Sequence, residues 1–376
     1  MDVMLVVVVA VILVAVAAAL RPRPQRDLRG KVVLLTGAGG GLGRVLALAL
    51  ARRGCQIACA DVAPKPNKQT ADDVVRQTGA VARAYTTDLS KKGDVDALVA
   101  AAIKDFGHVD ILVSNAGQLE GGAVWDVTDD GLDLILDVNL RATMLLVRAL
   151  MPHMRARRSG HLVAVSSLAG ELDMPCIAAY AATKAGLSRF MGCLYQDLCR
   201  DGLGQDIHIT TIRPFFMATY QRLVDSVKFG KLTQWLLPFM DPAESAELMV
   251  DAIARQDHVV NLPFHLAALA VILRLLPYSV VAFIVNNIVK FDIPQLVSYQ
   301  KRHQELDADL LHELLTKKYT LDQDPEPVCR RLAEELAAGR PLPHDYKPLA
   351  AGVEAFYRQH QRPVPEAVRK VFPSLS

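Results

Sequence analysis

The sequence predicts a doubly wound parallel α/β sheet, and three observations lead to this prediction. Short apolar runs alternate with amphipathic stretches of about ten or more residues over residues 31–214, as strands joined by crossover helices do. One run leads directly into a glycine-rich turn, TGAGGGLG, at residues 36–43. Hydrophobic residues make up 51% of the chain but aromatic residues only 6%, as expected for buried parallel strands with small-residue helices between them.

The predicted elements follow one another in a regular order, without an internal repeat or a low-complexity tract. The predicted strands lie at residues 31–37, 55–61, 82–87, 109–117, 161–167 and 207–214, and the first of them is predicted to be buried. A helix follows the glycine turn through Arg52, and further helices are predicted over residues 70–78, 95–106, 137–154 and 179–200. The spacing therefore predicts one sheet with helices on both of its faces.

The composition excludes several classes of protein. Lys and Arg number 42 and Asp and Glu 40, so the formal net charge is only +2 and no basic field favours nucleic acid. We therefore expect no nucleic-acid partner. Six cysteines are scattered without a CxxC pair or a histidine at zinc spacing, so we expect reduced thiols in a cytosolic domain and no metal site.

The first 20 residues predict a membrane anchor. Val3 to Leu20 is an unbroken apolar run of 18 residues, close to the length that crosses the hydrocarbon core of a bilayer. Five basic residues follow between Arg21 and Lys31, which places the rest of the chain on the cytoplasmic side. The alternative is a cleaved secretory peptide, but Asp2 rather than a basic residue precedes the run, which is also longer than a usual signal core.

The chain is thus divided into an anchor (1–20), a basic linker (21–30), a sheet domain (31–258) and two later segments (259–290 and 291–376). The segment 259–290 is very apolar but is interrupted by two prolines and two basic residues, and its longest clean run is too short to span a bilayer. Two interpretations stay open for it: a helix packed on the core, and a surface that dips into the bilayer beside the functional site. The last segment is a charged extension with helical patches, and the sequence assigns it no function.

The glycine turn predicts a dinucleotide site. Its glycines permit a tight turn, bring backbone N–H groups against a pyrophosphate, and let the next helix pack closely. Asp61 ends the second predicted strand 18 residues after Gly43, where its carboxylate can accept hydrogen bonds from the adenosine ribose hydroxyls. That charge would repel a 2′-phosphate, and Gly40 supplies no arginine to receive one. The sequence therefore favours NAD over NADP; the alternative for Asp61 is a solvated carboxylate at a strand end.

Two further polar residues follow predicted strands. Asp88 comes after the third strand and is suited to accept a hydrogen bond from the adenine amine. Asn115 ends the fourth strand, at the edge of the sheet where ligands bind in this architecture. Each of them alone fits a structural role equally well.

Tyr180 and Lys184 carry the strongest indication of chemistry. They are four residues apart on a predicted helix and therefore share one face. An ammonium near a phenol favours the phenolate, so we expect the pKa of Tyr180 to be lowered toward physiological pH. Ser167 ends the preceding strand, where its hydroxyl can donate to a substrate oxygen and stabilise developing charge.

These motifs resemble the short-chain dehydrogenase/reductase family. The resemblance covers about Leu28 to Ala254 and rests on the glycine turn, SNAG at 114–117, YAATK at 180–184, and a serine 13 residues before the tyrosine. It implies that Tyr180 is the acid/base, that Lys184 also holds the nicotinamide ribose, that Ser167 orients substrate, and that Asn139 in DVNL carries a proton relay. The cofactor-binding set that it implies is Thr36, Gly37, Gly41, Leu42, Gly43, Asp61, Asp88, Leu89, Asn115, Ala116, Gly117, Tyr180, Lys184, Pro214 and Thr219. The family's Pro-Gly turn appears here as Pro214-Phe215, a departure that affects the shape of the loop.

The anchor, Asp61 and the stretch LPFHLAALAVILRLLP further resemble the microsomal branch of that family, which contains retinol and 17β-hydroxysteroid dehydrogenases. The resemblance implies a membrane-bound enzyme of the endoplasmic reticulum or the lipid droplet, and it leaves a homodimer open. Large apolar residues crowd into the 26 positions after Pro214, which favours an apolar substrate contacted by Phe216, Ser167 and Tyr180.

The leading hypothesis is NAD-dependent interconversion of a hydroxyl and a carbonyl on a retinoid, a steroid or a long-chain alcohol. The alternatives are a carbonyl reductase that uses NADPH, and a non-catalytic membrane or lipid-surface protein of the same fold. The complete set of serine, tyrosine, lysine and asparagine argues against the second alternative, because a binding protein needs none of them.

Overall fold

The computed structural model describes residues 24–119, 121–219 and 239–291, together with Val224, Val227, Phe229, Gly230 and Thr233. All of them belong to the first of two compact units, which ends at Leu296. The predicted anchor, and the extension beyond Phe291, lie outside the described residues. Among the residues that are described, no helix is long and apolar enough to cross a membrane.

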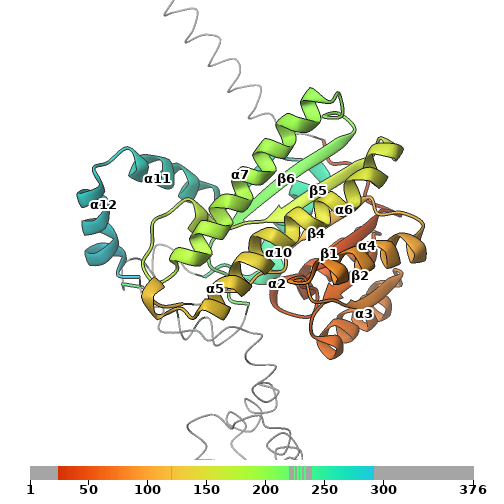
Figure 1. Ribbon diagram of the computed structural model, residues 1–376, viewed down its shortest axis with the longest axis horizontal. Helices are drawn as coiled ribbons and strands as arrows, with labels where there is room; N and C mark the ends of the chain where they lie inside the picture. The colour runs from red at the N-terminus through yellow and green to blue at the C-terminus, as the bar shows by residue number, and fades with distance from the viewer. Residues whose placement is uncertain are drawn as a thin grey trace, which may run out of the picture. The chain divides into compact units, whose positions relative to one another are not determined.

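Seven parallel strands form one sheet in the order β3-β2-β1-β4-β5-β6-β7 (Figure 1). The strands are β1 (Val32–Thr36), β2 (Gln56–Asp61), β3 (Ala82–Thr86), β4 (Ile111–Ser114), β5 (Gly160–Val165), β6 (Ile207–Pro214) and β7 (Val259–Leu262). Because β1 pairs with β2 on one side and with β4 on the other, the strand order reverses at β1. The prediction of a doubly wound parallel sheet is therefore confirmed, and ligands bind such sheets at the carboxyl edge beside this reversal.

Helices cover both faces of the sheet. On one face α2 (Gly41–Arg52), α3 (Pro64–Thr78) and α10 (Pro242–Arg255) share a buried core with side chains such as Val33 and Leu35. On the other face α4 (Lys92–Phe106), α6 (Ala142–Arg157) and α7 (Ala178–Arg200) pack on side chains such as Leu34. Neighbouring residues of β1 thus point to opposite faces, and both are buried, which is why the strand reads as an uninterrupted apolar run.

The structure differs from the sequence prediction in three elements. The helix expected over residues 137–154 is part of a longer helical stretch: α5 (Asp129–Leu136), a π-helix (Asp137–Arg141) and then α6. Helix α10 was not predicted. The first residues of the apolar segment 259–290 form β7, which pairs with β6 and extends the sheet past the expected boundary at residue 258.

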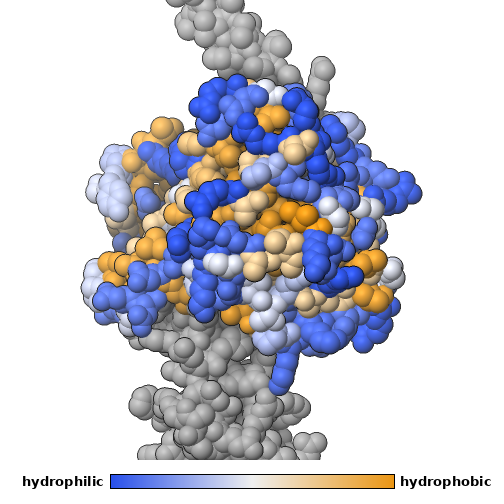
Figure 2. Space-filling view, turned by 45° about the vertical axis from the view of Figure 1, so that its right-hand side comes forward, coloured by the Kyte–Doolittle hydropathy of each residue, from blue (hydrophilic) through white to orange (hydrophobic). Residues whose placement is uncertain are grey.

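The rest of that segment is helical and lies beyond the sheet edge formed by β7. It contains α11 (Phe264–Arg274), α12 (Tyr278–Ile284) and a second π-helix (Val285–Val289). In Figure 1 these helices lie at the opposite end of the sheet from α3. Large hydrophobic side chains are exposed on several elements, and the face in Figure 2 shows hydrophobic residues in patches among hydrophilic ones.

One buried histidine makes the stability of the fold depend on pH. His161 lies on β5 with 4% of its surface exposed, and one ring nitrogen is 2.8 Å from Thr210 Oγ1 on β6. Burial, and then the charges of His208 and His258, lower the pKa of His161 to about 3. The folded protein therefore holds this ring neutral at pH values where the unfolded chain binds a proton.

Above pH 6.5, the ordinary pKa of histidine, we expect no loss of the free energy of unfolding from His161. Below that pH we expect the free energy of unfolding to fall, because only the unfolded chain takes up the proton. One proton taken up only on unfolding corresponds to a slope of about 1.4 kcal/mol per pH unit. Urea unfolding between about pH 7.5 and 5 measures this slope, in a window above the ordinary pKa of carboxyl groups. The control is His161→Gln, which keeps a hydrogen-bonding group for Thr210 but does not titrate. Identical slopes for both proteins would contradict this assignment.

Candidate active site

Two glycines of the turn between β1 and α2, Gly37 and Gly43, are packed too tightly to carry side chains. Gly37 has φ +66°, and a Cβ there would lie 2.8 Å from the Cα of Ala116. A Cβ on Gly43 would lie 1.9 Å from the carbonyl oxygen of Gly37. Helix α2 begins with Gly41, whose φ is +50°, and the buried Leu42, which lie between these two glycines. The backbone N–H groups at the start of α2 can therefore approach a phosphate closely, as a dinucleotide pyrophosphate requires.

Asn115 ties the end of β4 to this turn. Its Nδ2 donates to the carbonyl oxygens of Thr36, at 3.0 Å, and Gly37, at 3.3 Å. The backbone N–H groups of Asn115 and Ala116 both donate to Thr36 Oγ1, at 3.0 and 3.1 Å. Thr36, Asn115 and Ala116, which the sequence assigned to the cofactor, thus also fix the shape of the turn.

Asp61 ends β2 beside the glycine turn. Its Oδ2 accepts a hydrogen bond from the backbone N–H of Gly39, and its Oδ1 accepts one from Ala63, both at 2.9 Å. A Cβ on Gly39 would lie 2.9 Å from Asp61 Cγ, so this close approach requires glycine. The carboxylate is thereby held where the adenosine ribose of a dinucleotide fits in this architecture.

Asp88 is engaged within its own turn after β3. Its Oδ1 accepts from the backbone N–H and the hydroxyl of Ser90, and its Oδ2 lies 3.1 Å from Lys91 Nζ. Burial raises the pKa of this carboxyl, but hydrogen bonds from Ser90 and Lys91 outweigh burial and leave the pKa below its ordinary value. The neighbouring Leu89 is buried in the core.

Tyr180, Lys184 and Ser167 come together at the carboxyl end of β5. Tyr180 and Lys184 lie on α7, and the Nζ of Lys184 is 5.6 Å from the centre of the Tyr180 ring. That Nζ is almost fully buried and donates to the carbonyl oxygen of Val165 at 2.9 Å. Ser167 follows β5, where its hydroxyl accepts from the backbone N–H of Ala169 and lies 3.4 Å from the carbonyl oxygen of Pro214.

Asn139 lies on the π-helix between α5 and α6 and links two parts of the site. Its Oδ1 accepts from the backbone N–H of Gln118 at 2.7 Å, and its Nδ2 donates to the carbonyl oxygen of Gln118 at 2.9 Å. The same Nδ2 donates to Thr183 Oγ1, on α7, at 3.2 Å. A Cβ on Gly117 would lie 3.4 Å from Lys184 Nζ and 3.5 Å from Asn139 Oδ1, so the SNAG loop directly borders both side chains.

The electrostatics of this group correct one expectation. Burial raises the pKa of Tyr180, and a hydrogen bond with Ser167 only partly opposes this effect. Burial also lowers the pKa of Lys184 to about 8. The expectation that the ammonium lowers the phenol pKa is therefore wrong for the protein alone, because the cost of placing either charge in a buried site is larger. Near neutral pH, Tyr180 is a neutral phenol beside a cationic Lys184.

A cluster of aromatic rings lies beside Tyr180. Phe216, expected to contact substrate, packs with four other phenylalanines at ring-centre distances of 5.3 to 6.2 Å: Phe215, Phe229, Phe239 and Phe291. The same buried group includes Met174, Ile177 and Tyr180. Thr219, assigned to the cofactor, is the last described residue before a largely undescribed stretch, and its N–H donates to the carbonyl oxygen of Met217.

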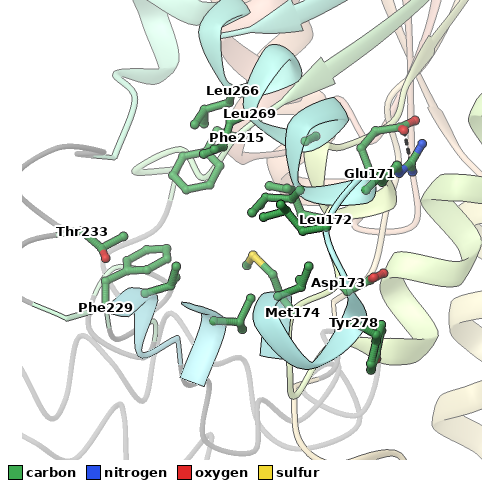
Figure 3. A pocket seen from close by; sticks show the side chains of 17 residues that line it. Glu171, Leu172, Asp173, Met174, Phe215, Phe229, Thr233, Leu266, Leu269 and Tyr278 are labelled. Carbon is green, nitrogen blue, oxygen red and sulfur yellow. Dashed lines mark ion pairs between the residues drawn. The ribbon is translucent and has the colours of Figure 1, made fainter. Parts of the chain in front are cut away.

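Behind these rings lies an apolar cavity of about 200 Å³ that the sequence did not predict. Figure 3 shows Leu172, Phe215 and Leu266 among the side chains that line it, with an ion pair at Glu171 on its rim. Glu171 pairs with Arg274 of α11 at 2.7 Å and with Arg213 of β6 at 3.1 Å. The only feature of the sequence that could have pointed to Glu171 is its position four residues after Ser167.

The part of the chain that the structure describes contains no group of three or more His, Cys, Asp or Glu side chains that could hold a metal ion.

Known proteins share both the sequence pattern and the fold. The sequence profile of short chain dehydrogenases matches residues 31–223. Epidermal retinol dehydrogenase 2 of Mus musculus is 31% identical over 281 residues, which cover 74% of this chain and 89% of that protein. Dehydrogenase/reductase SDR family member 7B of Bos taurus is 29% identical over 258 residues, or 66% of this chain and 78% of that one.

A solved structure gives the same result. The crystal structure of a short chain dehydrogenase/reductase from Burkholderia phymatum in complex with NAD has a TM-score of 0.58 and 26% identity, and it covers 66% of this chain and 94% of that one. The fold, the site and these relatives agree: the chain belongs to the short-chain dehydrogenase/reductase family, in the branch that contains retinol dehydrogenases.

Proposed function

We propose that the protein is an NAD-dependent oxidoreductase that interconverts a hydroxyl and a carbonyl on a lipophilic substrate. The observation that carries the proposal is the convergence of Tyr180, Ser167 and Lys184 at the sheet edge that also holds the glycine turn and Asp61. The substrate is a retinoid, a steroid or a long-chain alcohol. The aromatic cluster beside Tyr180 supports an apolar substrate, as does the similarity to a protein named as a retinol dehydrogenase.

The chain's own residues would manage the proton and orient the substrate. When bound, the nicotinamide of NAD supplies a hydride acceptor for the carbinol carbon. In the direction of oxidation, Tyr180 first gives its phenol proton to the relay, the Lys184 ammonium stabilises the resulting phenolate, and that phenolate then accepts the hydroxyl proton. Ser167 donates a hydrogen bond to the substrate oxygen. Asn139, held by Gln118 and Thr183, stands where it can carry the proton relay from the Lys184 side of the site.

The other residues assigned to the cofactor would position it. The glycine turn receives the pyrophosphate, with Thr36, Asn115, Ala116 and Gly117 behind it, and Asp61 receives the adenosine ribose. Asp88 and Leu89 would border the adenine, while Pro214 and Thr219 would border the nicotinamide amide. Asp61 also distinguishes this proposal from its alternative, NADPH-dependent carbonyl reduction, because its charge disfavours a 2′-phosphate.

We further propose that residues 1–20 anchor the enzyme in the membrane of the endoplasmic reticulum or the lipid droplet, with the catalytic domain facing the cytosol. The unbroken apolar run and the basic residues that follow it support this location. Release of the full chain from membranes by alkaline carbonate would contradict the anchor.

Tyr180→Phe tests the chemical proposal. The ring still packs in the aromatic cluster but no longer passes a proton, so we expect turnover of a lipid alcohol to fall by at least about a hundredfold. NAD binding should stay nearly unchanged when it is measured by equilibrium titration. The matched control is Tyr195→Phe on the same helix, whose ring packs on His258 away from Ser167. Substantial activity in Tyr180→Phe would show that another group transfers the proton.

Asp61→Ala combined with Gly40→Arg tests the choice of cofactor. The change removes the charge that repels a 2′-phosphate and supplies a cation to receive it. Gly40 has an extended backbone, with φ −167°, which residues other than glycine also adopt. We expect the preference for NAD over NADP, measured as the ratio of kcat/KM values, to shift toward NADP by about a hundredfold. An unmodified protein that already prefers NADP would contradict the role given to Asp61.

A further inference from the structure

Helices α11 and α12 and the π-helix after them expose an unusual concentration of large apolar side chains. Phe264, Leu275 and Tyr278 are 82%, 81% and 76% exposed, and Phe283 is 62% exposed. Others on the same helices are also exposed, namely Leu269, Val271, Ile272, Leu276, Val280 and Ile288. We call residues 264–289 the α11–α12 surface. A concentration of exposed apolar side chains of this kind on a folded domain indicates a surface that contacts something apolar.

Three polar side chains of this surface have partners within the molecule. Asn286 and Asn287 each donate their side-chain amide to the carbonyl oxygen four residues earlier, at 2.9 Å, although both are exposed. The charge of Arg274 is balanced by Glu171 at 2.7 Å. Residues 264–289 contain no Asp or Glu. This surface therefore tolerates a medium that offers few hydrogen bonds, and it has no acidic side chain to bury there.

The cavity behind the aromatic cluster reaches this surface. Leu269, Leu276 and Tyr278 line the cavity and are themselves 40%, 37% and 76% exposed. Met174, Phe215 and Phe229 also line the cavity, and Met174 and Phe229 belong to the cluster that contains Tyr180. The cavity is thus lined both by side chains beside the aromatic cluster and by side chains of the α11–α12 surface (Figure 3).

We propose that the α11–α12 surface docks on a lipid bilayer, so that the cavity opens into the acyl layer. A lipid surface fits the observations better than a protein does, because a protein partner would seal the cavity, and the apolar run at residues 3–20 would bring the domain to a membrane. The cavity's role as an entrance for an apolar substrate rests on the proposed function. The docking itself does not.

A tryptophan placed on the surface tests the docking without measuring turnover. The chain has two tryptophans, which Trp125→Phe and Trp235→Phe remove. Phe283→Trp then reports from α12, and Val75→Trp, 48% exposed on α3, is the matched control at the opposite edge of the sheet. Both full-length proteins are bound to phosphatidylcholine vesicles whose acyl chains carry bromine, which quenches tryptophan only on contact. Flotation of the vesicles verifies that the protein is bound.

We expect the emission of Phe283→Trp to shift to shorter wavelength and to be largely quenched, while the emission of Val75→Trp is unchanged. A short-wavelength emission without quenching would overturn the proposal, because residues 292–376 or a second copy of the chain would then cover the surface. Water-exposed emission from Phe283→Trp, equal quenching at both positions, or failure of the protein to float would overturn it as well. The failure of Tyr180→Phe to lose activity would leave this result untouched.

Discussion

A buried ammonium is the constraint on which the rest of this site depends. Lys184 is 3% exposed, and its Nζ is held by the carbonyl oxygen of Val165 at the end of β5. Burying a cation with so few partners is costly, and the pKa lowered to about 8 is the sign of that cost. The fold accepts it because α7 packs directly on the end of β5. A Cβ on Gly170 would lie 2.6 Å from the N–H nitrogen of Ala185, so only glycine permits this approach.

The positions of the other polar groups follow from where Lys184 lies. Tyr180 is one turn earlier on the same face of α7, so its ring stands beside the ammonium at the mouth of the site. Thr183, between them, accepts from Asn139, and the π-helix that carries Asn139 is thereby joined to α7. The protein alone leaves the phenol neutral, because burial raises its pKa. Burying these ionisable groups costs electrostatic free energy, which bound charges and dipoles can offset. Such perturbed groups are common in catalytic sites.

The sequence was informative wherever function requires a particular residue at a strand end. The glycine turn, Asp61, Asn115 and Ser167 were predicted as site residues because they follow strands, and parallel strands bring their carboxyl ends to one edge. Tyr180 was predicted from its spacing to Lys184 on one face of a helix. The segment 259–290 was harder, since a short apolar run does not distinguish a buried strand from a buried helix, and its first residues proved to be β7. Phe229, Phe291 and the ion pair of Glu171 with Arg274 depend on contacts between distant parts of the chain, for which no local pattern exists. The direction of the pKa of Tyr180 was also missed, because desolvation depends on the packed structure and not on spacing.

Direct hydride transfer from substrate to nicotinamide at this site is tested most directly by the fate of an isotope. The full-length protein in phospholipid vesicles would be given NAD and a long-chain alcohol or retinol that carries deuterium on the carbinol carbon. Mass spectrometry of the nucleotide product should then find NADH that contains the deuterium, because the hydride passes from the carbinol carbon to the nicotinamide without exchange with water. NADH that contains no deuterium would contradict direct hydride transfer. So would a failure to form any NADH from retinoid, steroid and long-chain alcohol substrates.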